Sequence, residues 1–197
     1  DYLEDCGWLH DKTWLAHGIH FDDSEIARLG AAGVGVSHCP TSNMGLASGH
    51  CRTLELEKAG VAVGLGVDGS ASNDNSNLME GVRHALMMNR LIYGASAVTH
   101  LDALRWATEG SARCLGREKL GKIAPGYQAD LAMFTLDELR FSGAGDPLAA
   151  LVLCGAHRAD RVMIRGRWTV EDGMPVGIDV ARLRHDHGAV AKLFAES

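Results

Sequence analysis

The stretch that decides the fold class is Val61-Ala62-Val63-Gly64-Leu65-Gly66-Val67-Asp68, an apolar run that stops at an acid. Two earlier runs have the same form: Thr13-Trp14-Leu15-Ala16 stops at His17, and Gly33-Val34-Gly35-Val36-Ser37 stops at His38. Helical patterns separate the three runs, and short strands that alternate with helices predict parallel pairing in an α/β fold. In such folds the carboxyl ends of the strands lie at one edge of the sheet, where functional sites are built.

Four helices are expected around these strands. They cover about residues 22–32, 52–59, 78–91 and 99–116. The first follows the acidic, cap-like segment Asp22-Asp23-Ser24-Glu25, and the last begins at Thr99, where Asp102 completes a capping-box pattern. Between the second strand and the second helix, a segment rich in Gly, Ser and Asn predicts a loop.

The sequence pattern changes after about residue 120, from alternating strands and helices to turns and short strands. Residues 121–177 are turn-rich and predict a small β module, with a strand over 130–135, a further apolar run at 149–154 and a hairpin over 161–168. Residues 178–197 carry apolar side chains at a three–four spacing, which is typical of an amphipathic helix docked on a core. We therefore expect three parts, residues 1–120, 121–177 and 178–197.

Composition limits the classes of protein to consider. Of the 197 residues, 46% are hydrophobic and 22% are charged, as in globular domains. No apolar run approaches the length of a membrane span, so a transmembrane protein is not expected. The formal net charge of −6 argues against non-specific nucleic-acid binding, which requires a basic face.

Two further features bear on compartment and completeness. Five cysteines, an odd number without C-x-x-C spacing, indicate reduced thiols in a cytoplasmic protein rather than a disulfide framework. No signal peptide is visible in the first residues. The chain lacks an initiator Met and opens inside a helical pattern, so we expect it to be the C-terminal part of a longer protein.

Each of the three predicted strands is followed by a residue that can carry a charge: His17, His38 and Asp68. This pattern is the main indication of a functional site in the sequence. A single histidine at a strand end is more often structural than functional, but three titratable residues at successive strand ends favour a site. Imidazole and carboxylate together suit a divalent metal with a bound water.

Three other patterns compete with this interpretation. Residues 64–69 match G-x-G-x-x-G after a strand, but a polar loop follows and the residues about twenty further on lie in a predicted helix, so dinucleotide binding is disfavoured. His185 and His187 lie two apart on a helix, where their side chains diverge and cannot hold one metal. Cys39 beside His38 suggests a cysteine hydrolase, yet neighbours on a strand point to opposite faces and form a poor nucleophile–base pair.

Three motifs resemble those of the amidohydrolase superfamily. They are Trp14-Leu15-Ala16-His17-Gly18-Ile19-His20, Val36-Ser37-His38-Cys39-Pro40-Thr41-Ser42-Asn43 and Gly66-Val67-Asp68-Gly69-Ser70-Ala71-Ser72-Asn73. A later segment, Gly121-Lys122-Ile123 with Gly126-Tyr127-Gln128-Ala129-Asp130-Leu131, is similar to the point where that family's chain returns into its small β domain. The motifs most resemble the branch of guanine, S-adenosylhomocysteine and triazine deaminases and dechlorinases.

The resemblance implies a distorted (β/α)8 TIM barrel and a β-sandwich built from both chain ends. On this match, residues 1–120 hold barrel strands six to eight with their helices, residues 121–177 hold the C-terminal share of the sandwich, and residues 178–197 form a C-terminal helix. The family's metal-binding H-x-H of strand one and H-x-x-E of strand five have no counterpart here and are expected upstream of Asp1. The missing N-terminal barrel half is then a necessary partner, and a homo-oligomer is left open.

The resemblance also implies roles for single residues. Asp68 matches the strand-eight metal ligand, which also carries a proton between water and leaving group. His17 matches the strand-six histidine that hydrogen-bonds the attacking hydroxide or the developing oxyanion. His38 and Asn43 belong to a family motif and are expected to lie behind the reacting groups or to order the loop, while His20 is either a substrate contact or a surface residue. One divalent metal is implied, zinc or alternatively iron.

The activity that the resemblance implies is hydrolytic deamination of a purine-like base. The loops after the second and third strands most resemble those of 8-oxoguanine deaminases, which form urate and ammonia. Aminohydrolases or chlorohydrolases of triazines, guanine or S-adenosylhomocysteine are the alternatives. Another class of explanation is a non-catalytic binding module that has lost its metal, since one clear ligand is fewer than the three or four of a zinc site. Neither nucleic acid nor a membrane is expected as a partner.

Overall fold

The computed structural model of the chain describes residues 1–196. The chain forms two compact units. The first comprises residues 1–128 and 136–157, and the second comprises residues 129–135 with the chain from residue 158 onward. The sequence suggests domain boundaries near residues 120 and 177. These boundaries stay predictions.

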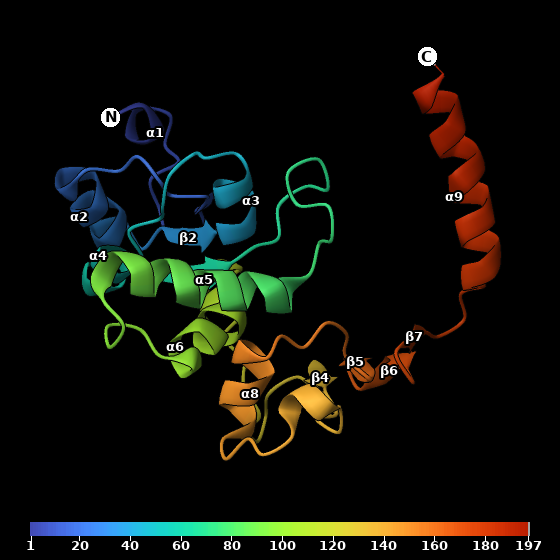
Figure 1. Ribbon diagram of the computed structural model, residues 1–197. Helices are drawn as coiled ribbons and strands as arrows, with labels where there is room; N and C mark the ends of the chain where they lie inside the picture. The colour runs from blue at the N-terminus through green and yellow to red at the C-terminus, as the bar shows by residue number, and fades with distance from the viewer. Residues whose placement is uncertain (197) are drawn as a thin grey trace. The chain divides into compact units, whose positions relative to one another are not determined.

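A parallel sheet of three strands lies at the centre of the first unit (Figure 1). In chain order and in spatial order the strands are β1 (Trp14–Ala16), β2 (Gly35–His38) and β3 (Ala62–Leu65). Leu15 lies opposite Val36, and Val36 lies opposite Val63. The predicted α/β fold with parallel strands is confirmed.

One face of this sheet carries the main hydrophobic core. Val36 and Val63 point to the same face because they are paired in register, and both are buried. They belong to a cluster with residues of three helices, α2 (Asp23–Ala32), α4 (Thr53–Lys58) and α5 (Leu78–Tyr93). Each buried aliphatic side chain contributes about 1.5–3 kcal/mol to folding. The core therefore fixes the strands from which the site residues project.

Helix α2 begins and ends at residues that suit helix termini. The Asp22 side chain accepts a hydrogen bond from the Glu25 backbone N–H, and the Glu25 side chain accepts one from the Asp22 N–H. This reciprocal capping box satisfies two of the unpaired N–H groups of the first turn. Gly33 ends the helix at a φ of 72°, a left-handed conformation that glycine adopts without steric cost.

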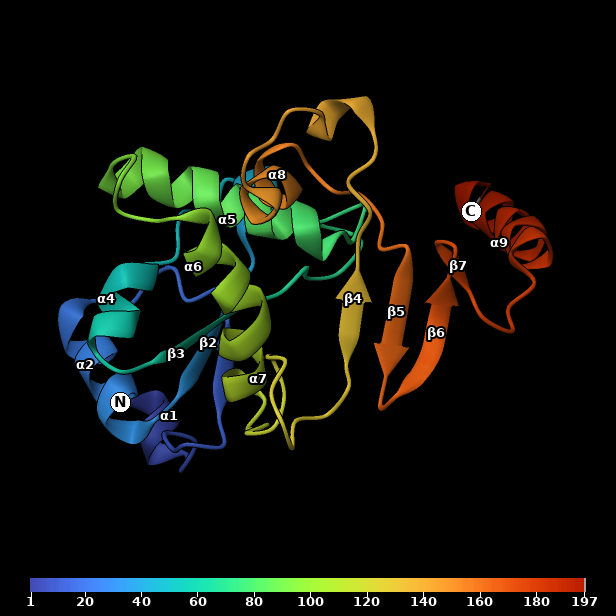
Figure 2. The same ribbon diagram turned by 90° about the horizontal axis from the view of Figure 1, so that it is seen from below.

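The segment after α5 is a helical run with one widened turn. It consists of α6 (His100–Arg105), a π-helical turn (Trp106–Gly110) and α7 (Ser111–Cys114). Thr99 and Asp102 form the capping box that the sequence predicts. Gly64, whose neighbour Val63 faces the core, approaches Ser111, so α7 packs on the opposite face of the sheet. Figure 2 shows α2 and α4 on one side of β2 and β3 and α7 on the other.

Gly110 allows this helical run to approach the sheet closely. A Cβ atom at this position would lie 1.9 Å from the carbonyl oxygen of Val63. We therefore expect Gly110→Ala to lower the free energy of unfolding by about 2 kcal/mol or more, because the helix and the strand would have to separate. Urea unfolding measures the change.

Gly81→Ala in α5 is the matched control for this variant. The nearest atom to a Cβ at Gly81 is Cδ1 of Leu78 at 3.9 Å, an ordinary contact. Alanine is the better helix former by about 1 kcal/mol, so this variant should be as stable as the parent or more stable. Equal stabilities of the two variants would contradict the close packing at Gly110.

Two segments are helical where the sequence predicts a loop or a β module. The segment after β2 begins with the helix α3 (Pro40–Gly45), in which proline occupies the first position and suits the fixed φ of that residue. The apolar run at 149–154 lies almost entirely in α8 (Pro147–Leu153), which Asp146 caps and which belongs to the first unit. A short apolar or polar run does not by itself distinguish helix from strand or loop, and local capping decides here.

The second unit contains an antiparallel sheet of four strands, visible in Figure 2. The strands are β4 (Leu131–Met133), β5 (Arg161–Ile164), β6 (Arg167–Glu171) and β7 (Met174–Pro175). The predicted strand within 130–135 and the predicted hairpin over 161–168 are confirmed.

The predicted C-terminal helix is present as α9 (Val180–Ala195). It differs from the expected docked helix, because its described residues are exposed or half-buried and none is buried. Across residues 1–196, no helix is both long enough and apolar enough to cross a membrane.

Candidate active site

His17 directly follows β1, Asp68 is the third residue after the end of β3, and the backbone turns sharply at both. Their φ angles are 67° and 65°, in the left-handed region that residues with side chains rarely adopt. Such conformations persist where the surrounding structure enforces them, and they concentrate at functional sites. The turns take both side chains out of the regular alternation of the strands.

The side chains of His17 and Asp68 face each other. Nε2 of His17 lies 3.7 Å from Oδ2 of Asp68, and about a third of each side chain is exposed (38% and 30%). On the other side of the ring, Nδ1 of His17 lies 2.8 Å from Oδ1 of Asn43. Because an amide oxygen can only accept, Nδ1 donates this hydrogen bond. Three of the five residues singled out from the sequence thus form one cluster.

Asp68 accepts hydrogen bonds on both of its oxygens. Oδ2 accepts from Oγ of Ser42 at 2.6 Å and from Oγ of Ser72 at 3.0 Å, and Oδ1 accepts from the backbone N–H of Gly69 at 2.8 Å. These bonds, with that of Ser42 the strongest, lower the pKa of the Asp68 carboxyl because they favour its charged form. Asp68 is therefore a carboxylate at neutral pH, with three of its about four lone-pair positions filled.

His38 lies behind this cluster as a neutral imidazole. Its side chain is fully buried, and within residues 1–196 neither ring nitrogen has a hydrogen-bond partner. Burial, with smaller contributions from His50 and His17, lowers the pKa of His38 to about 3. His38 is therefore uncharged over the physiological range and is sealed from solvent.

The structure does not bring His20 into the cluster. His20 is exposed in the loop after β1. Its place in the sequence motif leaves it a candidate for contact with a substrate, and this assignment stays a prediction.

The structure gives no support to the cysteine-hydrolase and dinucleotide interpretations. The Cys39 thiol donates to the carbonyl oxygen of Ser37 at 3.6 Å, and burial raises the pKa of Cys39, so the reactive thiolate is disfavoured. Residues 66–77 separate β3 from α5, so the glycines at 64–69 do not open a helix as a dinucleotide-binding turn does.

Ser42 and Ser72 are the site residues that sequence reasoning missed. Both lie inside motifs that the sequence singles out, and both donate to the Asp68 carboxylate. Serine is so common in loops that its presence in a sequence does not indicate which group its hydroxyl contacts. The one signal was position: each serine directly precedes an asparagine of its motif, Asn43 or Asn73.

The described residues do not assemble a complete metal site. Among residues 1–196, no three His, Cys, Asp or Glu side chains are placed together so that they could hold an ion. Zinc usually has three or four protein ligands. Asp68 by itself fits a ligand, because it is anionic, partly exposed and keeps an unfilled lone pair. A metal bound at Asp68 would therefore need further ligands beside this carboxylate.

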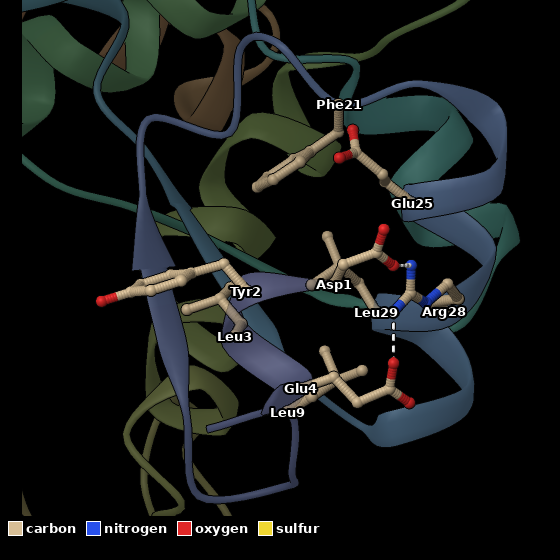
Figure 3. Close-up of a pocket in the computed structure, with 9 residues that line it drawn as sticks. All are labelled: Asp1, Tyr2, Leu3, Glu4, Leu9, Phe21, Glu25, Arg28 and Leu29. Atoms are coloured by element: carbon tan, nitrogen blue, oxygen red, sulfur yellow. Dashed lines mark hydrogen bonds and ion pairs between the residues drawn. The ribbon is translucent and has the colours of Figure 1, made fainter. Parts of the chain in front are cut away.

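A pocket of about 150 Å³ lies away from this cluster, between α1 (Tyr2–Asp5) and α2. Figure 3 shows Arg28 reaching from α2 toward Asp1 and Glu4, with which it forms hydrogen-bonded ion pairs. The lining of the pocket includes neither His17 nor Asp68. Arg28 is already paired with two acids and so is not free to bind an anion, and the site of interest remains at the strand ends.

A comparison with protein-family models assigns most of the chain to one family. Residues 1–169 match the model of the amidohydrolase family. The chain belongs to this family. The resemblance that the three sequence motifs indicate is confirmed, and the α/β fold is that of amidohydrolase structures.

Individual amidohydrolases cover most of the chain. An 8-oxoguanine deaminase from Pseudomonas aeruginosa PAO1 is 62% identical over 191 residues, which are 97% of this chain and 42% of that protein. The structure of an adenosine deaminase from Xanthomonas campestris with bound zinc has a TM-score of 0.94 at 30% identity, over 100% of this chain and 45% of that chain. The structure of atrazine chlorohydrolase from Arthrobacter aurescens TC1, complexed with zinc, has a TM-score of 0.90 at 35% identity. The match covers 95% of this chain and 42% of that chain. The chain thus spans less than half the length of these relatives.

Proposed function

We propose that the complete protein is a metal-dependent hydrolase that deaminates a purine-like base, with 8-oxoguanine as the preferred substrate and urate and ammonia as products. The observation that supports this proposal is the pair formed by His17 and Asp68, in which Nε2 of the imidazole lies 3.7 Å from the carboxylate. The 62% identity to an 8-oxoguanine deaminase supports the choice of substrate.

Asp68 is the residue of this chain that holds a divalent metal, for which zinc is the first choice and iron the alternative. Its lowered pKa suits a ligand, because the carboxylate need not lose a proton before it binds an ion. The other ligands are expected upstream of Asp1. When bound, such a metal lowers the pKa of a coordinated water toward neutrality.

His17 and Asp68 bind and transfer the protons of the attacking water. The oxygen of the attacking water bonds to the ring carbon that bears the exocyclic amine, and the bond between that carbon and the amine nitrogen breaks. Asp68 takes a proton from the water oxygen and delivers it to the departing nitrogen, so that ammonia leaves instead of an amide ion. His17, whose Nε2 faces the same space, binds the attacking oxygen.

The family membership supports a finer proposal about the fold. Residues 1–120 would form strands six to eight of a distorted (β/α)8 barrel, residues 121–177 would contribute to the β-sandwich, and the C-terminal part from residue 178 would contain the terminal helix α9. In the described chain, β1 and β3 are edge strands with one unpaired side each. The N-terminal barrel half would pair with them. Cytoplasmic location and a homo-oligomer stay predictions.

Ammonia release from a substrate panel tests the activity. The panel contains 8-oxoguanine, guanine, isoguanine, S-adenosylhomocysteine and hydroxyatrazine, each added to the complete protein with zinc. We expect turnover of 8-oxoguanine at a kcat/KM at least about 10²-fold above the others, since buried groups that lose a hydrogen-bond partner discriminate strongly. A preference for the triazine or for S-adenosylhomocysteine would replace the substrate but keep the chemistry.

The same panel separates the enzyme from a non-catalytic module. If metal binds and no member releases ammonia, the hydrolytic proposal fails and a binding role gains support. The related triazine hydrolases make hydroxyatrazine the most informative competitor, because they share the fold of this chain at a TM-score of 0.90.

A further inference from the structure

Helix α3 connects three neighbours through three successive side chains. Oγ1 of Thr41 lies 3.0 Å from Nδ1 of His84 on α5, Ser42 donates to the carboxylate of the site, and Asn43 accepts from its histidine. Successive residues of a helix point about 100° apart, so each of the three faces a different element. A helix of six residues thus holds the reacting groups in place.

We propose that Asn43 is a positioning residue that holds His17 in the tautomer with its proton on Nδ1 and its lone pair on Nε2. The inference rests on the proposed function and specifies how His17 takes part in it. The bond that one ring nitrogen of a histidine makes determines which nitrogen carries the proton. Here that bond is made to Oδ1 of Asn43 at 2.8 Å, and an amide oxygen can only accept.

The opposite tautomer would place an unfavourable contact at Nδ1 and would turn Nε2 from an acceptor into a donor. The Nδ1 lone pair would then face the lone pairs of Oδ1 of Asn43 at 2.8 Å. Nε2 would instead carry a hydrogen toward Oδ2 of Asp68, 3.7 Å away. With a hydrogen on Nε2, His17 could no longer accept a hydrogen bond from the attacking water.

Asn43 is itself fixed well enough to impose this choice. Its side chain is 1% exposed, so it cannot turn into solvent. Its backbone N–H donates to the carbonyl oxygen of Cys39, and its carbonyl oxygen accepts from the N–H of Ser48, both at 2.9 Å. Within residues 1–196, Nδ2 of Asn43 has no hydrogen-bond partner, so the bond to His17 is the one that orients the amide.

The tautomer decides what His17 does in the first step. Nε2 of His17 lies 3.7 Å from the carboxylate of Asp68, whose unfilled lone pair is on Oδ1 because Oδ2 already accepts from Ser42 and Ser72. A water molecule can donate one O–H to Nε2 and the other to this carboxylate. As the water oxygen bonds to the ring carbon, one O–H bond breaks and Asp68 takes that proton to the leaving nitrogen. His17 accepts the other O–H as a hydrogen bond and orients the oxygen. His17 is thus an acceptor at the start of the reaction, not an oxyanion donor.

Nitrogen NMR of histidine reads the tautomer directly. The complete protein is labelled with ¹⁵N-histidine, loaded with zinc and measured without substrate, and the spectrum of His17→Gln identifies the His17 signals by their absence. We expect a protonated Nδ1 and an unprotonated Nε2 in the parent protein. A protonated Nε2 there would overturn the proposal, whatever the variants do.

Three variants connect the tautomer to turnover. Asn43→Leu removes the acceptor, so both tautomers should be populated and kcat should fall about 10- to 100-fold with KM within about threefold. Asn43→Asp keeps an acceptor oxygen and should keep the proton on Nδ1. Thr41→Val, the matched control, breaks the bond of α3 to His84 and should lower stability without changing the tautomer.

The outcomes separate this inference from the proposed function. An unchanged His17 spectrum in a folded Asn43→Leu protein would refute the positioning role. The expected tautomer pattern in a protein that deaminates no member of the panel would uphold the role of Asn43 and reject the proposed activity.

Discussion

Asp68→Asn is expected to lower kcat/KM by about 10³-fold or more and to deplete the protein of its metal. The amide removes the negative charge on which metal binding depends, and it cannot accept the proton that moves to the leaving nitrogen. The fold should survive, because asparagine is isosteric and its amide oxygen can still accept from Ser42 and from Ser72. Steady-state rates with 8-oxoguanine and metal analysis of the same samples measure the two effects.

Asp74→Asn is the matched control for this prediction. Asp74 lies six positions further along the same loop and is exposed, so the same chemical change occurs away from the pair with His17. We expect this variant to keep its metal and its rate within about threefold, as exposed charges contribute little. Full metal content and full turnover in Asp68→Asn would remove Asp68 from both of its proposed roles.

The lowered pKa of Asp68 creates a tension between these two roles. A carboxyl of lowered pKa is already ionised when a metal binds, but it is a weaker base, and proton transfer is most efficient for a group whose pKa lies near the working pH. The exchange remains feasible if the proton moves at once to a leaving amine, which is far more basic than a carboxylate. Ser42 therefore favours the ligand role, while the basicity of the leaving nitrogen drives the relay.

The strands and their order could be predicted because apolar runs and their terminal residues are local signals. Val61 to Asp68 predicts a buried strand with a polar end in any context, and parallel pairing brings the carboxyl ends of the three strands to one edge of the sheet. The same locality explains the capping box at Thr99, where four residues determine the helix start. These elements needed no knowledge of distant neighbours.

The contacts that define the site could not be read in this way. The bond between Ser42 and Asp68 joins residues 26 positions apart, and so does the bond between Asn43 and His17. Both depend on the helical turn of α3, for which the sequence suggested a loop. Similarity to a family located the motif, whereas only the fold shows which side chain of the motif meets which partner. His38 shows the converse, since a strand-end histidine proved to be sealed and unpaired.

This buried histidine should make the protein sensitive to acid. The pKa of His38 is about 3 in the folded chain, against the ordinary value of 6.5. Between those values the unfolded chain binds a proton that the folded chain does not, so stability rises with pH by about 1.4 kcal/mol per unit. The stability is fully present above pH 6.5 and is lost as the pH falls toward 3. We expect the loss to reach about 2 kcal/mol at pH 5 and about 4 kcal/mol by pH 3.

His38→Leu should remove this dependence, because leucine binds no proton in either state. At pH 7 the variant should be at least as stable as the parent, since it no longer buries two ring nitrogens without partners. Urea unfolding at pH 7, 6 and 5 gives the slope for the parent, for His38→Leu and for the control His185→Leu, whose histidine side chain is 85% exposed. The control should follow the parent. Parallel slopes for all three proteins would mean that the folded chain protonates His38 at no cost, and that the imidazole is not the neutral, sealed group on which the geometry behind the site depends.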